Sequence, residues 1–171
     1  MKKDFRSFVL CLVIAALAIG TVASAADKSA SAATFDMLAS LVGDWKGELS
    51  GTEVTLTYTL TANGTALMEE FRPKTGGVMI TMFTVDGDHL VATHYCALGN
   101  QPHMKTGAIT DPQTKEVVFS LDGVTGMATP EDWHNTGLRV ILEDKDHLTQ
   151  EWTYLAKGET GKSVFHFTRK S

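Results

Sequence analysis

The chain has 171 residues, of which 43% are hydrophobic and 20% charged, and its formal net charge is −5 at pH 7. This length and composition are typical of one globular domain whose core is large enough to be stable on its own. An acidic chain without a basic stripe repels phosphate backbones, which excludes nucleic acid as an expected partner.

The first 25 residues have the composition of a secretory signal peptide. Three basic residues precede an apolar run from Phe8 to Ala18, and residues 23–25 are the small residues of a cleavage site. Gly20 and Thr21 interrupt the apolar run before it reaches the roughly 20 residues that a membrane-spanning helix needs. An uncleaved membrane anchor is therefore the less favoured alternative. We expect a periplasmic or secreted protein with no stable membrane anchor after cleavage.

Cleavage after Ala25 would change both the charge and the cysteine content of the chain. The mature chain would carry a net charge of −7, because the leader contains three basic residues and one acidic residue. Loss of Cys11 would leave Cys96 as the single cysteine, so no internal disulfide could form. The stability of such an exported domain must come from burial of apolar side chains.

A short helix is expected at the start of the mature domain. Residues 26–33 are small and polar, which predicts a disordered leader. Thr34 can cap a helix that ends at Gly43 and has four apolar residues on one face, namely Phe35, Leu38, Leu41 and Val42. Residues 34–171 are therefore assigned to the folded domain.

After Gly43 the apolar pattern changes to the alternation that is typical of half-buried strands. In residues 53–60 every second side chain is apolar, and Thr or Glu lies between them. Asn63-Gly64 predicts a type I′ hairpin turn, and similar turns separate the later strands. After a first strand that opens at Gly43, strands are expected over 53–60, 65–71, 77–85, 89–96, 103–109, 116–121, 137–142, 147–155 and 162–169.

This spacing predicts an all-β fold, an antiparallel up-and-down β-barrel of about ten strands, because no helix is long enough for a parallel crossover. A sandwich of two sheets is the alternative. Residues 122–137 break the regular spacing. Within them, Thr129-Pro130-Glu131 resembles a helix cap followed by proline, which predicts a short helical lid that carries Trp133 and His134.

The direction of the side chains around His94 decides where a site could form. Residues 86–96 resemble residues 144–154, and aligning the two segments gives His94 the phase of Trp152. The alternate residues of the second segment are polar and are expected to face outward. We therefore expect Trp152, His94 and Cys96 to point into the barrel.

The same reasoning turns Glu69 inward, and a buried carboxylate needs a partner such as His94 or Gln150. Polar groups inside an apolar wall are typical of a ligand cavity. The predicted site for a small apolar or amphipathic molecule comprises Tyr58, Glu69, Phe71, His94, Gln150 and Trp152, with His134 at the lid and Leu56, Met82 and Phe119 in the wall. The alternative is a filled core in which these groups satisfy one another.

Gly43, Trp45 and Gly47, after a short helix, resemble the Gly-x-Trp opening of calycin barrels, the group of lipocalins, fatty-acid-binding proteins and nitrobindins. In lipocalins this tryptophan packs across the closed end of the barrel against a basic side chain of the last strand. The resemblance therefore implies that Arg169 contacts Trp45. Residues 93–104 and residues 134–152 also resemble uncharacterised exported bacterial lipocalin-like proteins. That likeness spans nearly the whole mature chain and implies the barrel without a reaction.

A bound metal or haem is the alternative to a simple ligand cavity. His94 and Cys96 lie two positions apart and could share a metal ion with His134, although His-x-Cys is not a structural-zinc pattern. Nitrobindins hold haem through a histidine near the C-terminus, to which His166 is comparable. The phenylalanines on either side of His166 have the apolar phase, so His166 is expected to face outward.

No nucleophile elbow, phosphate-binding glycine loop or paired-carboxylate motif occurs in the sequence. A binding protein without a cofactor is therefore favoured over an enzyme.

Overall fold

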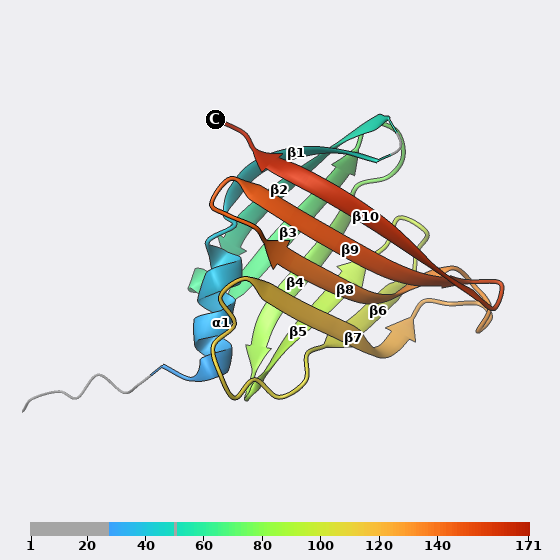
Figure 1. The fold of residues 1–171 in the computed structure, drawn as a ribbon. Helices are drawn as coiled ribbons and strands as arrows, with labels where there is room; N and C mark the ends of the chain where they lie inside the picture. The colour runs from blue at the N-terminus through green and yellow to red at the C-terminus, as the bar shows by residue number, and fades with distance from the viewer. Residues whose placement is uncertain (1–27, 50) are drawn as a thin grey trace, which may run out of the picture.

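The computed structural model describes residues 28–49 and 51–171, so the predicted signal peptide and its cleavage site lie outside the described residues. Ten strands form a closed barrel in which strands that follow each other along the chain pair antiparallel (Figure 1). The ring closes where the first strand pairs with the last. The predicted up-and-down barrel is confirmed, and the two-sheet sandwich is wrong.

A helix precedes the barrel, and a short 3-10 helix lies between two of the barrel strands. The elements are α1 (Ala30–Ala39), β1 (Gly43–Leu49), β2 (Thr52–Thr61), η1 (Ala62–Gly64), β3 (Ala66–Pro73), β4 (Met79–Asp86), β5 (His89–Tyr95), β6 (Gln101–Lys105), β7 (Glu116–Thr125), β8 (His134–Leu142), β9 (His147–Ala156) and β10 (Glu159–Arg169). Within the described ranges, 28–49 and 51–171, no helix has the length and apolar character needed to cross a membrane.

Helix α1 begins earlier than predicted. Its N-cap is Ser29 rather than Thr34, and Ser29 Oγ accepts a hydrogen bond from the first helical turn at 3.2 Å. Thr34 is buried inside the helix, where its Oγ1 donates to Ala30 O and accepts from Gln113 N, each at 2.8 Å. Residues 30–33 therefore belong to the helix and not to a disordered leader, because their alanines favour helix and Thr34 anchors the helix to the barrel.

The predicted turn at Asn63-Gly64 has a different structure. Residues 62–65 connect β2 to β3, and three of them in succession, Ala62, Asn63 and Gly64, have positive φ. The connection is therefore longer than the predicted two-residue type I′ turn.

The predicted helical lid is also wrong. Strand β7 continues to Thr125 because its end pairs with β6, and residues 126–133 form turns. The Asp132 carboxylate stabilises these turns by accepting from the backbone N–H groups of Ala128 and Thr129 and from the Thr129 hydroxyl. Thr129 is thus a donor in a turn and not the cap of a helix.

Helix α1 lies at one end of the barrel (Figure 1). Trp45 and Arg169 close this end. Trp45 is fully buried, and its Nε1 donates to Leu41 O at 2.8 Å. The Arg169 Cζ lies 4.1 Å from the centre of the indole ring, and the guanidinium donates to Val42 O at 2.8 Å and Ser40 O at 3.0 Å. The contact that the calycin resemblance implies is present, and it ties the last strand to the connection between α1 and β1.

The interior next to this closed end is filled by apolar side chains. Fully buried residues from strands all round the barrel pack there, including Leu67, Phe83, Leu90, Phe119, Leu148 and Phe167. This half of the barrel interior is therefore occupied by packed apolar side chains.

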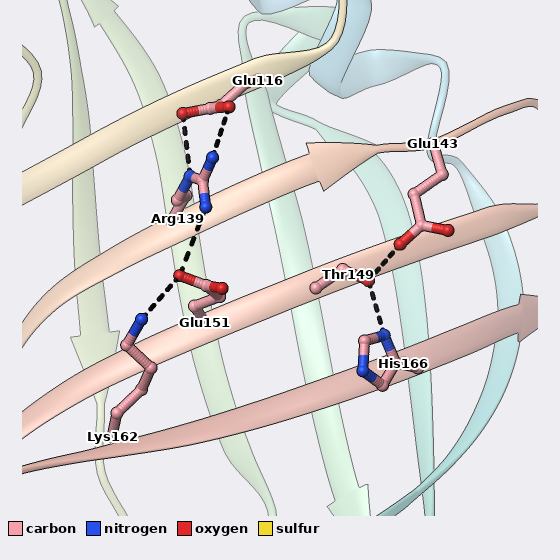
Figure 2. Close-up of polar contacts among 7 residues, drawn as sticks. All are labelled: Glu116, Arg139, Glu143, Thr149, Glu151, Lys162 and His166. Carbon is pink, nitrogen blue, oxygen red and sulfur yellow. Dashed lines mark hydrogen bonds and ion pairs between the residues drawn. The ribbon is translucent and has the colours of Figure 1, made fainter.

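The outer face of β7 to β10 carries a row of ion pairs (Figure 2). Arg139 on β8 donates to both carboxylate oxygens of Glu116 on β7, each at 2.8 Å, and to Glu151 on β9 at 3.4 Å. Lys162 on β10 donates to the same Glu151 at 3.0 Å. The neighbouring carboxylates raise the pKa of Arg139 and hold it charged. These pairs cross four neighbouring strands but lie outside the barrel interior.

Replacing Arg169 with alanine is expected to lower the free energy of unfolding by about 2–3 kcal/mol, because the change removes the indole contact and hydrogen bonds to backbone carbonyls. Urea unfolding followed by tryptophan fluorescence measures the loss. Arg139→Ala removes a guanidinium whose ion pairs are screened by solvent, and it should cause a smaller loss. Equal losses in the two variants would contradict the closing role of Arg169.

Candidate functional site

A cavity of about 390 Å³ lies inside the barrel at the end opposite α1. Most of its wall is aromatic or aliphatic and includes Val54, Phe71, Met79, Trp152, Tyr154 and Phe165. Glu69, His94 and Asn135 bring polar groups into this wall. The predicted combination of an apolar wall with a few polar groups therefore exists in the structure.

Four buried polar side chains, two of which line the cavity, form a row that crosses four neighbouring strands. Tyr58 on β2 pairs with Glu69 on β3, Glu69 pairs with Thr81 on β4, and Thr81 pairs with His94 on β5. All four are buried, with at most 3% of each residue exposed. Because paired residues of adjacent strands share one face of a sheet, the barrel register itself brings these side chains together.

Glu69 is held by hydrogen bonds from three directions. Its Oε2 accepts from the Tyr58 hydroxyl and from Gln150 Nε2, each at 2.5 Å, and its Oε1 lies 3.4 Å from Thr81 Oγ1. Gln150 also donates to the Tyr58 hydroxyl at 2.7 Å and accepts from Trp152 Nε1 at 2.9 Å. The predicted partner Gln150 is confirmed, whereas His94 reaches Glu69 only through Thr81.

His94 has one satisfied and one unsatisfied ring nitrogen. Its Nδ1 lies 3.0 Å from Thr81 Oγ1, and its ring packs against Trp152 with 4.8 Å between the ring centres. Its Nε2 is buried and has no hydrogen-bond partner in the described part of the chain. The predicted inward direction of His94 and Trp152 is confirmed, and the His94 ring forms part of the cavity wall.

Burial changes the ionisation of this row. It raises the pKa of Glu69 to about 7, although the hydrogen bonds from Tyr58, Gln150 and Thr81 oppose this change. Burial also lowers the pKa of His94 to about 4. Burial, followed by the nearby Glu69 carboxylate, raises the pKa of Tyr58 well above its ordinary value. At neutral pH the row therefore holds a neutral imidazole and a carboxyl group close to its own titration point.

The predicted ligand-binding residues divide into two layers. Glu69, Phe71, His94 and Trp152 line the cavity, while Tyr58 and Gln150 are buried behind them and hold Glu69. Three predicted wall residues do not line it. Leu56 and Phe119 belong to the packed core, and Met82 is only half-buried, on the outward phase of β4. Thr81 and Phe83 have the inward phase instead, because Thr81 pairs with Glu69 and His94.

Of the two residues that the predicted lid would carry, Trp133 lines the cavity and His134 does not. Trp133 lines the cavity beside Tyr154, with 5.4 Å between the ring centres. His134 does not line it, because Asn135 has the inward phase of β8 and His134 Nδ1 lies 2.7 Å from Asp132 O.

The buried amide of Asn100 links the β5–β6 connection to the segment that contains Trp133. The Nδ2 of Asn100 donates to the carbonyl of Trp133 at 2.7 Å. Asn100 therefore positions the tryptophan from behind and does not itself line the cavity.

The predicted metal site is not assembled. Within residues 28–49 and 51–171, no group of three or more His, Cys, Asp or Glu residues could hold a metal ion. Cys96 is buried in the turn after β5, where its Sγ accepts from Leu98 N at 3.5 Å, and it does not line the cavity. The set His94, Cys96 and His134 is therefore wrong as a metal site, since only His94 reaches the cavity.

His166 lies on the outer face of β10, as predicted. Its Nδ1 is 2.8 Å from Thr149 Oγ1, which donates to Glu143 (Figure 2). The flanking Phe165 and Phe167 are buried, whereas His166 is exposed. A haem inside the barrel could not be ligated by this histidine.

Several cavity residues were missed by the sequence interpretation. Thr81, Asn135, Tyr154 and Phe165 had no assigned role in the site, yet the last three line the cavity and Thr81 joins Glu69 to His94. The alternation around Phe165 was a usable signal, because it fixes that side chain inward. Asn135 had no such signal, since a shift in strand register between Asn135 and Gly137 breaks the alternation.

Comparisons with known proteins identify the fold and not a function. No protein-family model matches the chain, and no curated protein matches it. Among solved structures, Rv2717c from M. tuberculosis is 13% identical and has a TM-score of 0.56, with 81% of this chain and 98% of that one covered. A protein of unknown function from the DUF3598 family of Nostoc punctiforme is 14% identical with a TM-score of 0.51. That match covers 78% of this chain, which spans only 49% of the Nostoc protein. Both likenesses are consistent with a calycin-like barrel.

The raised pKa of Glu69 predicts a specific pH dependence of stability. An unfolded glutamate ionises near its ordinary pKa of 4.5, whereas folded Glu69 stays protonated up to about pH 7. Stability from this group is therefore full at acid pH and falls as the pH rises toward 7, by about 2–3 kcal/mol between pH 5 and pH 8. Glu69→Gln should abolish this loss in urea unfolding measured at the two pH values.

The ionisation of His94 changes stability with pH in the opposite direction to that of Glu69, so the same experiment must take both groups into account. Its lowered pKa of about 4 means that unfolding takes up a proton below the ordinary histidine value of 6.5, so stability falls as the pH drops. The two effects offset each other between about pH 4.5 and pH 6.5 in the parent protein, and Glu69→Gln should expose the histidine effect. An identical pH profile in the parent and the variant would show that Glu69 is not the titrating group.

Proposed function

We propose that the protein binds a neutral, mostly apolar small molecule in the cavity, with one polar group of the ligand directed at His94 Nε2. One observation carries the proposal: a largely apolar cavity of about 390 Å³ is lined by a buried histidine that has an unpartnered ring nitrogen. Its size lies within the range of small-molecule sites. A buried polar atom without a partner costs about 1–3 kcal/mol, which a ligand's hydrogen bond would recover.

The charge of the site favours a neutral ligand over an anionic one. Among the described residues that line the cavity there is no Lys or Arg. Glu69, which is partly ionised near pH 7, is the acidic residue in the same wall. A carboxylate ligand would lose its hydration without gaining a counter-charge, and it would be repelled by Glu69. The site therefore suits an alcohol, ketone or similar neutral amphiphile better than a fatty-acid anion.

The wall of the cavity suits a flat or flexible apolar body. Phe71 and Phe165 meet edge to face with 5.3 Å between ring centres, and Trp152 and Tyr154 continue the aromatic surface along β9. Aromatic walls of this kind contribute large apolar contact areas at little cost in side-chain entropy. The apolar part of the ligand would lie along these rings.

We also propose that the binding domain is exported, as the composition of residues 1–25 indicates. A lone cysteine would be compatible with an oxidising compartment, because it has no internal partner to mispair with. When the full-length chain is expressed in a bacterium with a general secretion system, the intact mass of the released protein should lack residues 1–25. A mass that retains these residues would argue against export by cleavage.

The binding proposal predicts a difference between 1-decanol and decanoate. At pH 8, 1-decanol should change the tryptophan fluorescence and bind at least about tenfold more tightly than decanoate, a difference of about 1.4 kcal/mol in binding free energy. Trp133 and Trp152 line the cavity and serve as the reporters.

Two tryptophan substitutions separate the cavity from the outer surface. Ser163→Trp places a large side chain in the cavity and should abolish 1-decanol binding. Val118→Trp adds the same side chain at an exposed position outside the barrel and should leave binding unchanged. Binding that survives Ser163→Trp, or that favours decanoate, would reject the proposed site.

A further inference from the structure

Thr81 lies between two groups that compete for its single hydroxyl proton. Its Oγ1 is 3.4 Å from Glu69 Oε1 on one side and 3.0 Å from His94 Nδ1 on the other. A threonine hydroxyl donates one hydrogen bond and accepts others, so it can donate to only one of these two groups at a time. Whichever group Thr81 does not donate to must itself donate to Thr81 if both contacts are to be hydrogen bonds.

The hydrogen bonds around Glu69 determine where its proton goes. Oε2 accepts from Tyr58 and from Gln150. Gln150 cannot turn its amide, because its oxygen accepts from Trp152 Nε1. The proton that Glu69 gains is therefore carried by Oε1, which faces Thr81.

Two arrangements of protons satisfy every contact in the row. When Glu69 is ionised, Thr81 donates to Glu69, His94 Nδ1–H donates to Thr81, and Nε2 is left as an acceptor. When Glu69 is protonated, Oε1–H donates to Thr81, Thr81 donates to Nδ1, and Nε2 carries the proton as a donor. The ionisation of Glu69 thus selects the tautomer of His94 without any movement of the backbone.

We infer that Glu69, Thr81 and His94 form a proton relay that sets which hydrogen-bonding group the cavity binds: a donor such as N–H or O–H when Glu69 is ionised, and a carbonyl acceptor when Glu69 is protonated. This inference rests on the proposed function, because it concerns the ligand of the same cavity. Since Nε2 is buried and unpartnered, a ligand of the wrong type would leave two buried groups unsatisfied.

Few other ionisable groups can disturb this relay. Tyr58 from β2 contacts Glu69, β4 and β9 contribute the neutral Thr81 and Gln150, and Trp152 packs on His94. Tyr154 is the other titratable side chain in the described cavity wall. The pKa of Glu69 lies at about 7 and that of His94 at about 4, so Glu69 alone titrates within the row between about pH 5.5 and about pH 8.5.

The first test needs no ligand. The ¹⁵N NMR shifts of the His94 ring in the ligand-free protein should show a protonated Nε2 at pH 5.5 and a protonated Nδ1 at pH 8.5. In Glu69→Gln the amide nitrogen must donate to Thr81, because the amide oxygen accepts from Tyr58 and Gln150. That variant should keep the low-pH tautomer at both pH values. The near-isosteric Thr81→Val should remove the pH dependence. A single tautomer in the parent protein at both pH values would overturn the relay.

The second test uses three tricyclic probes of similar shape. Carbazole offers an N–H donor, 9-fluorenone offers a carbonyl acceptor, and fluorene offers neither. The ratio of carbazole affinity to fluorenone affinity should rise on the order of tenfold from pH 5.5 to pH 8.5, while fluorene affinity stays constant. In Glu69→Gln the ratio should stay at its low-pH value.

The outcomes distinguish the two proposals. If all three probes bind but the affinity ratio is independent of pH, the relay is overturned and the binding function stands. If the His94 tautomer changes with pH but no probe binds, the proposed function is overturned, and the ligand preference is overturned with it. If the tautomer and the affinity ratio change together, with a midpoint near pH 7 that Glu69→Gln abolishes, both proposals are supported.

Discussion

The site depends on one buried carboxylate and the hydrogen bonds that hold it. Glu69 has no exposed surface, and burying an ionised group costs several kcal/mol unless partners compensate. Tyr58, Gln150 and Thr81 supply those partners from three other strands, so the barrel must close in one register for the carboxylate to be satisfied. These hydrogen bonds offset only part of the cost of burying the charge, so burial still raises the pKa of Glu69 to about 7. A group in this condition is stable in the fold and can still exchange a proton at physiological pH.

The two halves of the barrel divide the tasks of stability and binding. Next to α1 the interior is solid, and Arg169 over Trp45 joins the last strand to the first. Beyond the polar row the interior opens into the cavity, where His94 has one nitrogen in the hydrogen-bond row and one without a partner. The charged row on the outer wall has no contact with this system, since Arg139 and its partners face solvent. Recognition is therefore a property of a few buried polar groups inside an apolar wall.

The sequence predicted the fold well and the site in part, for physical reasons that can be named. Alternation of apolar residues gave the strands and the inward direction of His94 and Trp152, because side chains of a strand point to opposite faces in turn. The same rule failed for Met82, where both faces of β4 contain large apolar residues and only pairing with Glu69 and His94 selects Thr81. The metal set failed because neither Cys96 nor His134 lines the cavity. In β8 a register shift that no residue pattern announces accompanies the inward direction of Asn135. The Thr34 cap failed because the residue before Ala30 caps the helix instead.

The most direct measurement is a crystal structure of the protein with carbazole, grown at about pH 8.5. We expect electron density for the three rings between Phe71, Trp152 and Phe165, with the carbazole nitrogen within hydrogen-bond distance of His94 Nε2. Carbazole bound only on the outer surface, or an interior closed by repacked side chains with His94 bonded elsewhere, would contradict the cavity as the binding site.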